Sequence, residues 1–120
     1  MPFPTTAYLL TYDKQPGRNY GPLIHELRRL GCVSPAESVW FGRFTVSAPR
    51  IRQHLLPLLG FGGRLVIGEM KEGSDWATHN AAEGGADWLS WNVTPAEPKP
   101  IGTGLAPSPL SPLLLAMLTK

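Results

Sequence analysis

Apolar residues in this chain follow two spacings, one typical of strands and one typical of helices. The first extended run covers residues 7–12, where aromatic and aliphatic side chains predominate, and it ends at Asp13 before a turn-rich segment with Pro16 and Gly17. Aromatic and β-branched residues favour strands, whereas proline, glycine and asparagine end them. The pattern therefore predicts a strand near the N-terminus, with the carboxylate of Asp13 where the chain leaves the sheet.

Two further segments have the spacing of amphipathic helices. Apolar residues recur at intervals of three and four over residues 20–30, and a glycine follows as a stop. Ser47 is a suitable N-cap for a second helix, with Pro49 in its first turn and Pro57 disturbing its last turn before the glycine-rich residues 60–63. We expect these helices to lie on a sheet.

The remaining pattern predicts an α+β fold. Residues 32–46 indicate two short strands in a hairpin, and residues 64–70 indicate a buried strand because their apolar run is continuous. The order of elements is then βαββαβ, which predicts a ferredoxin-like sandwich with both helices on one face of the sheet. Residues 75–77 are expected to form a short edge segment, and residues 85–91 a last helical turn or two whose tryptophans are packing anchors.

The sequence divides into a ferredoxin-like domain, residues 1–92, and a Pro-rich tail, residues 93–120. A serine, a proline and a strongly apolar run over residues 111–118 predict a short C-terminal helical extension. Such a helix needs a surface to bury against, which its own core, the other protomer or another protein would supply. We therefore expect the tail to be ordered only where it docks on a preformed apolar groove.

Composition is typical of a globular protein with one domain. The chain has 120 residues, of which 42% are hydrophobic and 17% are charged, and no apolar run approaches the roughly 20 residues that a membrane span needs. The first residues carry no secretory signal, and Cys32 is the only cysteine, so no internal disulfide is expected. These features predict a cytoplasmic protein with no membrane partner.

Basic residues are concentrated in one part of the chain. Eight basic residues and two acidic ones lie between residues 14 and 64, although the formal net charge is only +2. Arginine binds phosphate through paired hydrogen bonds, so this excess favours a polyanion such as RNA or DNA. The alternative is a solvated surface that is rich in arginine. The candidate nucleic-acid-binding residues are Lys14, Arg18, Arg28, Arg29, Arg43, Arg50 and Arg52.

Asp13 is the candidate for chemistry. It is the only acidic residue before Glu26, and Lys14 and Arg18 flank it, which is the setting of a metal ligand in a site for an anionic substrate. The alternative is an aspartate that caps a turn at the end of a strand. The chain has no P-loop, HExxH, GxSxG or CxxC motif, and its three histidines lack the spacing of a metal pair.

Several short motifs occur together over residues 6–92. They are Thr11-Tyr12-Asp13, a Pro-Gly turn with Tyr20, then Leu23, Leu27 and Gly31, then Glu37-Ser38-Val39-Trp40, and finally Arg64-Leu65-Val66-Ile67. In this combination they resemble the SinR-type proteins. These belong with the small CRISPR adaptation subunit and the VapD toxins, a group of ferredoxin-like dimeric nucleases and their inactive relatives. The Pro-rich tail departs from this resemblance.

The resemblance implies a homodimer in which the strand-end aspartates of two protomers face each other and share a divalent metal. Asp13 would then be the metal ligand and a catalytic residue, with Tyr12 beside it in the catalytic site. Mg²⁺ is the expected ion, because it prefers one or two protein carboxylates with water and phosphate oxygens, and two-fold symmetry supplies the second carboxylate. The implied activity is that of an endonuclease on RNA or DNA. The alternative is a catalytically inactive dimer that binds nucleic acid or a protein.

Overall fold

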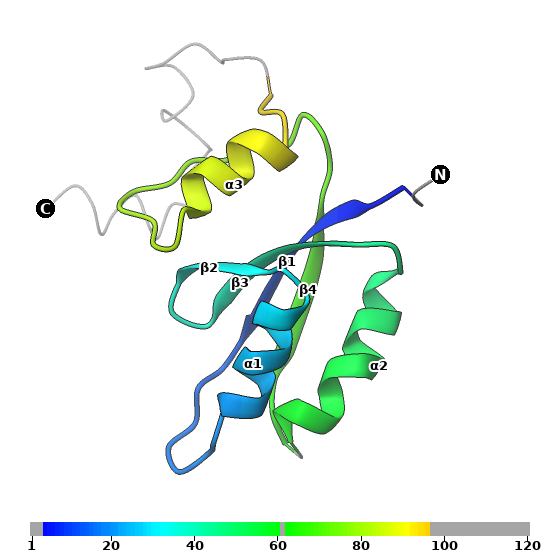
Figure 1. Ribbon diagram of the computed structural model, residues 1–120, viewed down its shortest axis with the longest axis vertical. Helices are drawn as coiled ribbons and strands as arrows, with labels where there is room; N and C mark the ends of the chain where they lie inside the picture. The colour runs from blue at the N-terminus through cyan, green and yellow to red at the C-terminus, as the bar shows by residue number, and fades with distance from the viewer. Residues whose placement is uncertain (1–3, 61, 97–120) are drawn as a thin grey trace, which may run out of the picture.

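The structure is a computed structural model that describes residues 4–60 and 62–96. Within these residues the chain forms a four-stranded antiparallel sheet, in the order β2-β3-β1-β4, together with three helices (Figure 1). The predicted α+β class is therefore confirmed. In chain order the elements are β1 (Thr6–Tyr12), α1 (Gly21–Arg29), β2 (Val33–Ala36), β3 (Val39–Phe44), α2 (Ala48–Leu59), β4 (Leu65–Met70) and α3 (Gly85–Asn92).

β1 is a central strand of the sheet. It pairs with β3 on one side and with β4 on the other, so that Leu10 lies opposite Trp40 of β3 and Ile67 of β4. β2 pairs with β3, which places β3 between β1 and β2. Successive side chains of a strand point to opposite faces, and the two faces of this sheet accordingly bury different sets of residues.

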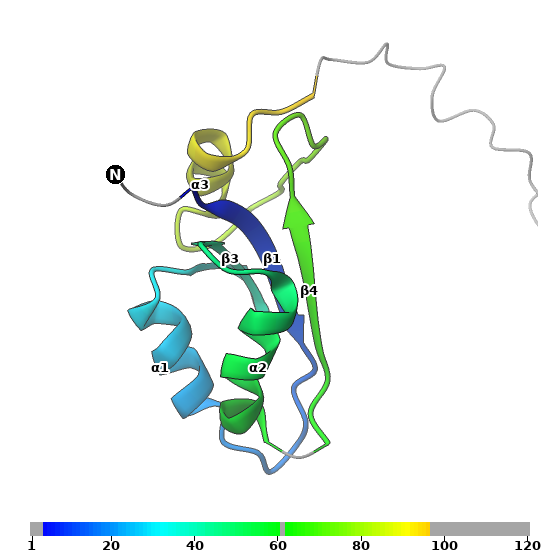
Figure 2. The same ribbon diagram turned by 90° about the vertical axis from the view of Figure 1, so that its right-hand side faces the viewer.

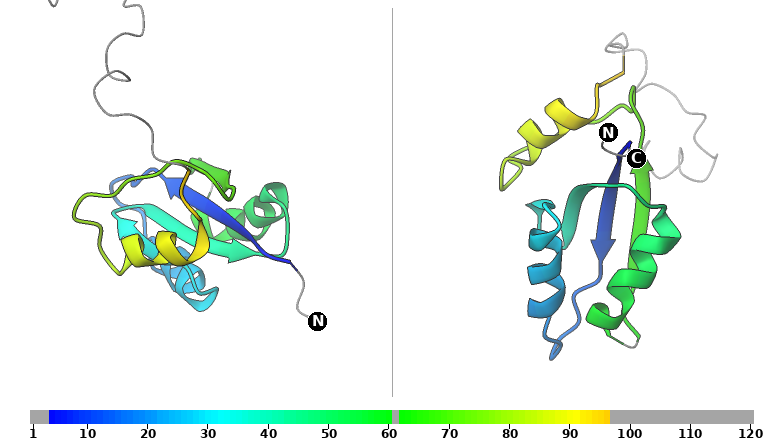
Figure 3. Two further views of the ribbon diagram at one scale, coloured as in Figure 1. Left: turned by 90° about the horizontal axis from the view of Figure 1, so that it is seen from above. Right: turned by 45° about the vertical axis from the view of Figure 1, so that its right-hand side comes forward.

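The inner face of the sheet is covered by α1 and α2, which lie side by side (Figure 2, Figure 3). Leu23 of α1 and Leu55 of α2 are fully buried in one core with Leu10 of β1. The first predicted helix ends as expected, because Gly31 adopts a φ of 84° that favours glycine. α2 begins after Ser47 as predicted. The sequence predicts that Pro57 disturbs the last turn of this helix, but the helix continues past it to Leu59.

The outer face is covered at one end by α3 and by the residue that follows it. Leu89 and Val93 are buried there with Phe41 of β3, although the sequence assigns Val93 to the tail. Gly85 allows α3 to lie close to β2, because a Cβ at this position would clash with Pro35. The predicted helix over residues 85–91 is therefore confirmed, and it completes a second, smaller core.

The strand predicted over residues 64–70 is confirmed as β4, but the prediction that it is buried is wrong. β4 is an edge strand that pairs with β1, and within the described residues Val66 on its outer face is 63% exposed. The continuous apolar run indicated burial on both faces. α3, however, contacts β2 at the opposite edge of the sheet, and within the described residues Met70 is the residue of β4 that packs against the outer core.

The segment between β4 and α3 also differs from the prediction. Residues 75–77 form no strand. Trp76 instead packs against the outer core, and its Nε1 donates a hydrogen bond to the carbonyl oxygen of Val93 at 3.0 Å. Trp88 stacks on Phe41 as a packing anchor, with ring centroids 5.4 Å apart, but Trp91 is 80% exposed and anchors nothing in the described chain.

The predicted C-terminal helical extension, residues 111–118, lies outside the described residues. In the part of the chain that the structure describes, no helix has the length and apolar character needed to cross a membrane.

Candidate functional site

Asp13 lies at the C-terminal end of β1, at the same end of the sheet as the start of β4 (Figure 1). Three contacts fix its surroundings. Its backbone N–H donates to the carbonyl oxygen of Arg64 at 3.3 Å, and the Tyr20 hydroxyl donates to its carbonyl oxygen at 3.1 Å. The same hydroxyl accepts a hydrogen bond from the backbone N–H of Gln15 at 2.6 Å. The backbone of Asp13 is therefore held by Arg64 and Tyr20, while the Asp13 side chain is 59% exposed.

Three basic side chains lie at this end of the sheet, and one of them contacts the Asp13 carboxylate. Nη1 of Arg64 lies 3.5 Å from Oδ2 of Asp13, and Arg18 lies against Gly60 in the loop before β4. Lys14 is paired with Glu37 at 3.3 Å in an exposed contact. We call the group Asp13, Lys14, Arg18 and Arg64 the Asp13 end of the sheet. A hollow of about 460 Å³ adjoins it and is lined in part by Lys14, Arg18 and Tyr20.

The ion pair between Asp13 and Arg64 is weak. Both side chains are largely exposed, at 59% and 81%, and the separation of 3.5 Å is long for a charge-assisted hydrogen bond. Exposed pairs of this kind contribute about 0–1 kcal/mol to folding. The Asp13 carboxylate can therefore leave this pair to bind a cation, and the Arg64 guanidinium can leave it to bind an anion.

Tyr12, the other residue of the implied catalytic site, directly precedes Asp13 at the end of β1. It is buried in the inner core, and its ring stacks on Tyr20 with centroids 5.3 Å apart. Tyr20 in turn donates the hydrogen bond to the backbone of Asp13. The structure thus gives Tyr12 the role of a support for the residue that holds Asp13 in place.

Two of the predicted phosphate-binding arginines, Arg28 and Arg29, have intramolecular partners. Arg28 donates to Glu83 at 2.8 Å, and its guanidinium carbon lies 5.4 Å from the ring centre of the buried Trp40. Arg29 makes two hydrogen bonds of 2.6 Å to Glu26. Two hydrogen bonds lower the pKa of the Glu83 carboxyl. The one from Arg28 has the larger effect, and the one from the Ser34 backbone N–H has the smaller effect. Both arginines therefore help to hold the fold together.

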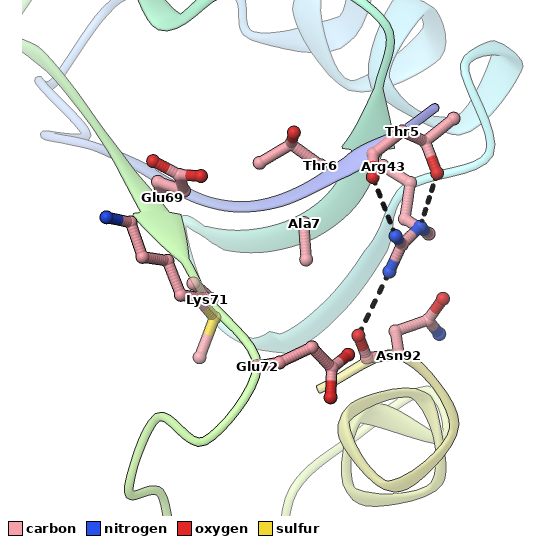
Figure 4. A pocket seen from close by; sticks show the side chains of 9 residues that line it. Thr5, Thr6, Ala7, Arg43, Glu69, Lys71, Glu72 and Asn92 are labelled. Atoms are coloured by element: carbon pink, nitrogen blue, oxygen red, sulfur yellow. Dashed lines mark hydrogen bonds between the residues drawn. The ribbon is translucent and has the colours of Figure 1, made fainter. Parts of the chain in front are cut away.

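Arg43 lies at the other end of the sheet, in a small polar pocket (Figure 4). Its Nε donates to the Thr5 hydroxyl at 2.7 Å, its Nη2 to the Thr5 carbonyl at 2.8 Å, and its Nη1 to the Asn92 carbonyl at 3.0 Å. The pocket holds about 180 Å³ and is also lined by Lys71 and Glu72. Arg43 thus connects the segment before β1 to the end of α3. We call the group Thr5, Arg43, Lys71, Glu72 and Asn92 the Arg43 end.

Arg50 and Arg52 project from the first turns of α2. Both are exposed, and neither has an ion pair or hydrogen bond through its side chain in the described chain. They line different hollows, Arg50 toward α1 and Arg52 toward β4. The seven predicted binding residues are therefore spread over several parts of the surface, and only Lys14 and Arg18 belong to the Asp13 end.

Arg64 is the member of the Asp13 end that was absent from the predicted binding residues. It directly precedes β4, whose first residue, Leu65, pairs with Tyr12 at the end of β1. The antiparallel register therefore brings Arg64 next to Asp13. The charge distribution along the chain does not show that Arg64 lies next to Asp13. The pairing of β4 with β1 is the signal that would have shown it.

Metal-ligating side chains form no cluster in the part of the chain that the structure describes. In residues 4–60 and 62–96 there is no group of three or more His, Cys, Asp or Glu side chains that could hold a metal ion. Cys32 is buried in the inner core, and this burial raises the pKa of its thiol to about 11, which disfavours the thiolate. Asp13 offers an exposed carboxylate directly after β1, a central strand.

No protein-family model matches the chain, and no solved structure matches it.

Proposed function

We propose that this protein is a homodimer with a ferredoxin-like fold that binds nucleic acid at the Asp13 end, where paired Asp13 residues hold Mg²⁺ for cleavage of RNA or DNA. One observation carries the proposal. The exposed carboxylate of Asp13 lies at the end of a central strand, where Arg64 makes only a weak ion pair with it and Arg18 lies against Gly60 in the loop before β4. This arrangement combines a hard oxygen ligand with cations that bind phosphate.

The arrangement of the elements supports the ferredoxin-like assignment. β3 lies between β1 and β2, so the β1-α1-β2 unit is split by another strand, and α1 and α2 both cover the inner face. A split unit of this kind is a feature of the ferredoxin-like sandwich. α3 is then an addition on the outer face.

The open side of β4 supports dimerisation. In the described chain, β4 has an unpaired edge, Val66 is 63% exposed, and a Cβ at Gly68 would meet no neighbouring atom. Exposed edge strands and apolar surface of this kind favour association. A second copy that covers this surface in a symmetric dimer would also bring a second Asp13.

The donor set fits Mg²⁺ if the site is shared. Mg²⁺ is usually bound through one or two carboxylates together with water and phosphate oxygens. Asp13 supplies one carboxylate from each protomer. When bound, the ion polarises a phosphate oxygen and lowers the pKa of a bound water. Arg64 and Arg18 then hold the phosphates of the substrate, and Tyr20 keeps the backbone of Asp13 in place.

A second candidate is binding without cleavage. The observation that favours it is the same ion pair, because Arg64 compensates the charge of Asp13 without any metal. In this case, the Asp13 end would present a net positive surface to the phosphates. The dimer would then bind nucleic acid or a partner but would not cut.

The experiment compares Asp13→Asn with Asp87→Asn, an exposed aspartate on α3, as a matched control. Cleavage of labelled single-stranded RNA, single-stranded DNA and duplex DNA is measured with Mg²⁺ and with a chelator. We expect Mg²⁺-dependent cleavage that falls by about 100-fold or more in Asp13→Asn, because loss of even an outer-shell partner costs about 10- to 100-fold. The control should keep wild-type activity.

Three other results have distinct meanings. Binding without cleavage by the wild-type protein would favour the second candidate. Equal activity of the two variants would remove Asp13 from the mechanism. Absence of both binding and cleavage at low salt would contradict the proposed function as a whole.

A further inference from the structure

A groove lies at the other end of the two inner helices, away from Asp13. It is formed by the C-terminal end of α1, the chain that leaves β3 and the first turns of α2, and it has a volume of about 300 Å³. Its floor is apolar, with Leu30, Phe44 and Ile51 among the residues that line it. Val46 also lines it and is 41% exposed, so it extends the apolar surface of the groove toward solvent.

Basic side chains form the rim of this groove. Arg29, Arg50 and His54 all line it. Arg29 and His54 are both held by Glu26, whose carboxylate lies 2.6 Å from each of them. Arg50 has no ion pair within residues 4–60 and 62–96. The rim therefore has two fixed basic groups and one arginine whose donors are available to a ligand.

Glu26 is tightly bound in this network. Its side chain is only 14% exposed, and the hydrogen bonds first from Arg29 and then from His54 lower its pKa to about 2. It therefore stays ionised and positions both basic groups. It compensates one positive charge, so Arg29 and Arg50 together leave the rim positive even when His54 is neutral.

We propose that this groove binds one nucleotide of a single-stranded nucleic acid, with the base on the apolar floor and the phosphate on Arg50. This inference rests on the proposed function. The volume lies at the lower limit of small-molecule clefts, which suits a ligand of about nucleotide size. Bases bind single-strand sites by stacking on aromatic and apolar side chains, and arginine contacts the phosphates. Phe44 and Arg50 supply these two elements side by side.

The groove and the Asp13 end lie at opposite ends of α2. This helix has 12 residues, which corresponds to a length of about 18 Å. A stacked strand rises about 3.4 Å per nucleotide along its axis, so about five nucleotides span the two sites. Oligonucleotides that are long enough to reach both sites should therefore bind more tightly than shorter ones.

The first experiment uses two arginines of the same helix. Arg50→Glu reverses a charge at the groove, and Arg52→Glu makes the same change two residues away, facing β4. Acidic residues are favourable near a helix N-terminus, so both variants should fold, and a thermal melt checks this. We expect Arg50→Glu to weaken binding of a labelled single-stranded DNA decamer at least fivefold more than Arg52→Glu. Equal losses in the two variants would overturn the inference.

The second experiment tests the groove without the Asp13 end. Methyl signals of Val46 are followed by nuclear magnetic resonance during titration with uridine monophosphate, uridine and inorganic phosphate. We expect the nucleotide to shift these signals at lower concentration than either part alone. An equal response to inorganic phosphate, or no response to the nucleotide, would overturn the inference. If in that case Arg64→Glu still weakened binding of the decamer about tenfold or more, the proposed function would stand without the groove.

Discussion

The two ends of β1 both carry charged side chains, but the charges serve different purposes. At the Arg43 end, Arg43 donates three hydrogen bonds to Thr5 and Asn92. At the Asp13 end, Asp13 and Arg64 are exposed and 3.5 Å apart. The comparison shows that the number of arginines in a sequence overstates the number of guanidinium groups without short internal hydrogen bonds. Arginines with short internal hydrogen bonds stabilise the fold, whereas those without them are available to a ligand.

The largest effect on stability should follow from removal of Arg43. Arg43→Ala leaves the Thr5 and Asn92 carbonyls without their donor and releases the start of β1 from α3. Hydrogen bonds to charged groups are worth about 1.5–3 kcal/mol when buried, and exposure here reduces the expected total to about 1–2 kcal/mol. For a domain of this size the melting temperature should fall by about 5–10 °C.

The matched control for that prediction is Arg64→Ala at the other end of the sheet. Its ion pair with Asp13 is long and exposed, so the free energy of unfolding should change by less than about 0.5 kcal/mol. Equal destabilisation by the two variants in thermal melts would break the comparison between the two ends.

A smaller effect is expected from Tyr20→Phe, which sharpens the description of the Asp13 end. The variant keeps the stacking on Tyr12 but removes the hydroxyl that joins Gln15 to Asp13. Loss of this link should cost about 1 kcal/mol in urea unfolding. Faster hydrogen exchange at the Gln15 amide would show that the loop has loosened. Unchanged exchange would mean that the hydroxyl does not hold the loop.

The smallest effect concerns pH and the Glu26 network. The pKa of Glu26 is lowered from 4.5 to about 2 in the folded protein, so the unfolded state binds more protons between these values. The stabilisation from this carboxylate is complete above its unfolded pKa and is lost as the pH falls through the folded pKa. The difference in melting temperature between wild-type and Glu26→Gln protein should therefore shrink from pH 5 toward pH 2. A difference that is constant over this range would contradict the assignment.

Much of the local structure follows from the sequence pattern. The helix predicted over residues 20–30 is α1, the hairpin predicted over residues 32–46 is β2 and β3, and Asp13 lies at a strand end as expected. These features depend on nearby residues: apolar spacing, glycine stops and turn residues. The position of the candidate site along the chain could therefore be predicted.

Other features depend on contacts between distant residues. The apolar run of β4 does not reveal that the strand lies at an edge with Val66 exposed, because this depends on where α3 packs. The pair Arg28 and Glu83 is separated by 55 positions, so the charge distribution along the chain gives no sign that this arginine is occupied. The resemblance to SinR-type proteins, the dimer and the shared Mg²⁺ stay predictions.

Arg64 and Lys71 directly flank β4, and they allow the most direct test of the claim that nucleic acid binds at the Asp13 end. Arg64→Glu and Lys71→Glu change the net charge equally, the first at the Asp13 end and the second at the Arg43 end. The measurement is the affinity for a labelled single-stranded oligonucleotide over a series of salt concentrations. The account predicts that Arg64→Glu weakens binding about tenfold or more and reduces the salt slope by about 1, the change expected for one lost phosphate contact. Lys71→Glu should stay close to wild type. Equal losses from the two variants, or a larger loss from Lys71→Glu, would contradict the central claim.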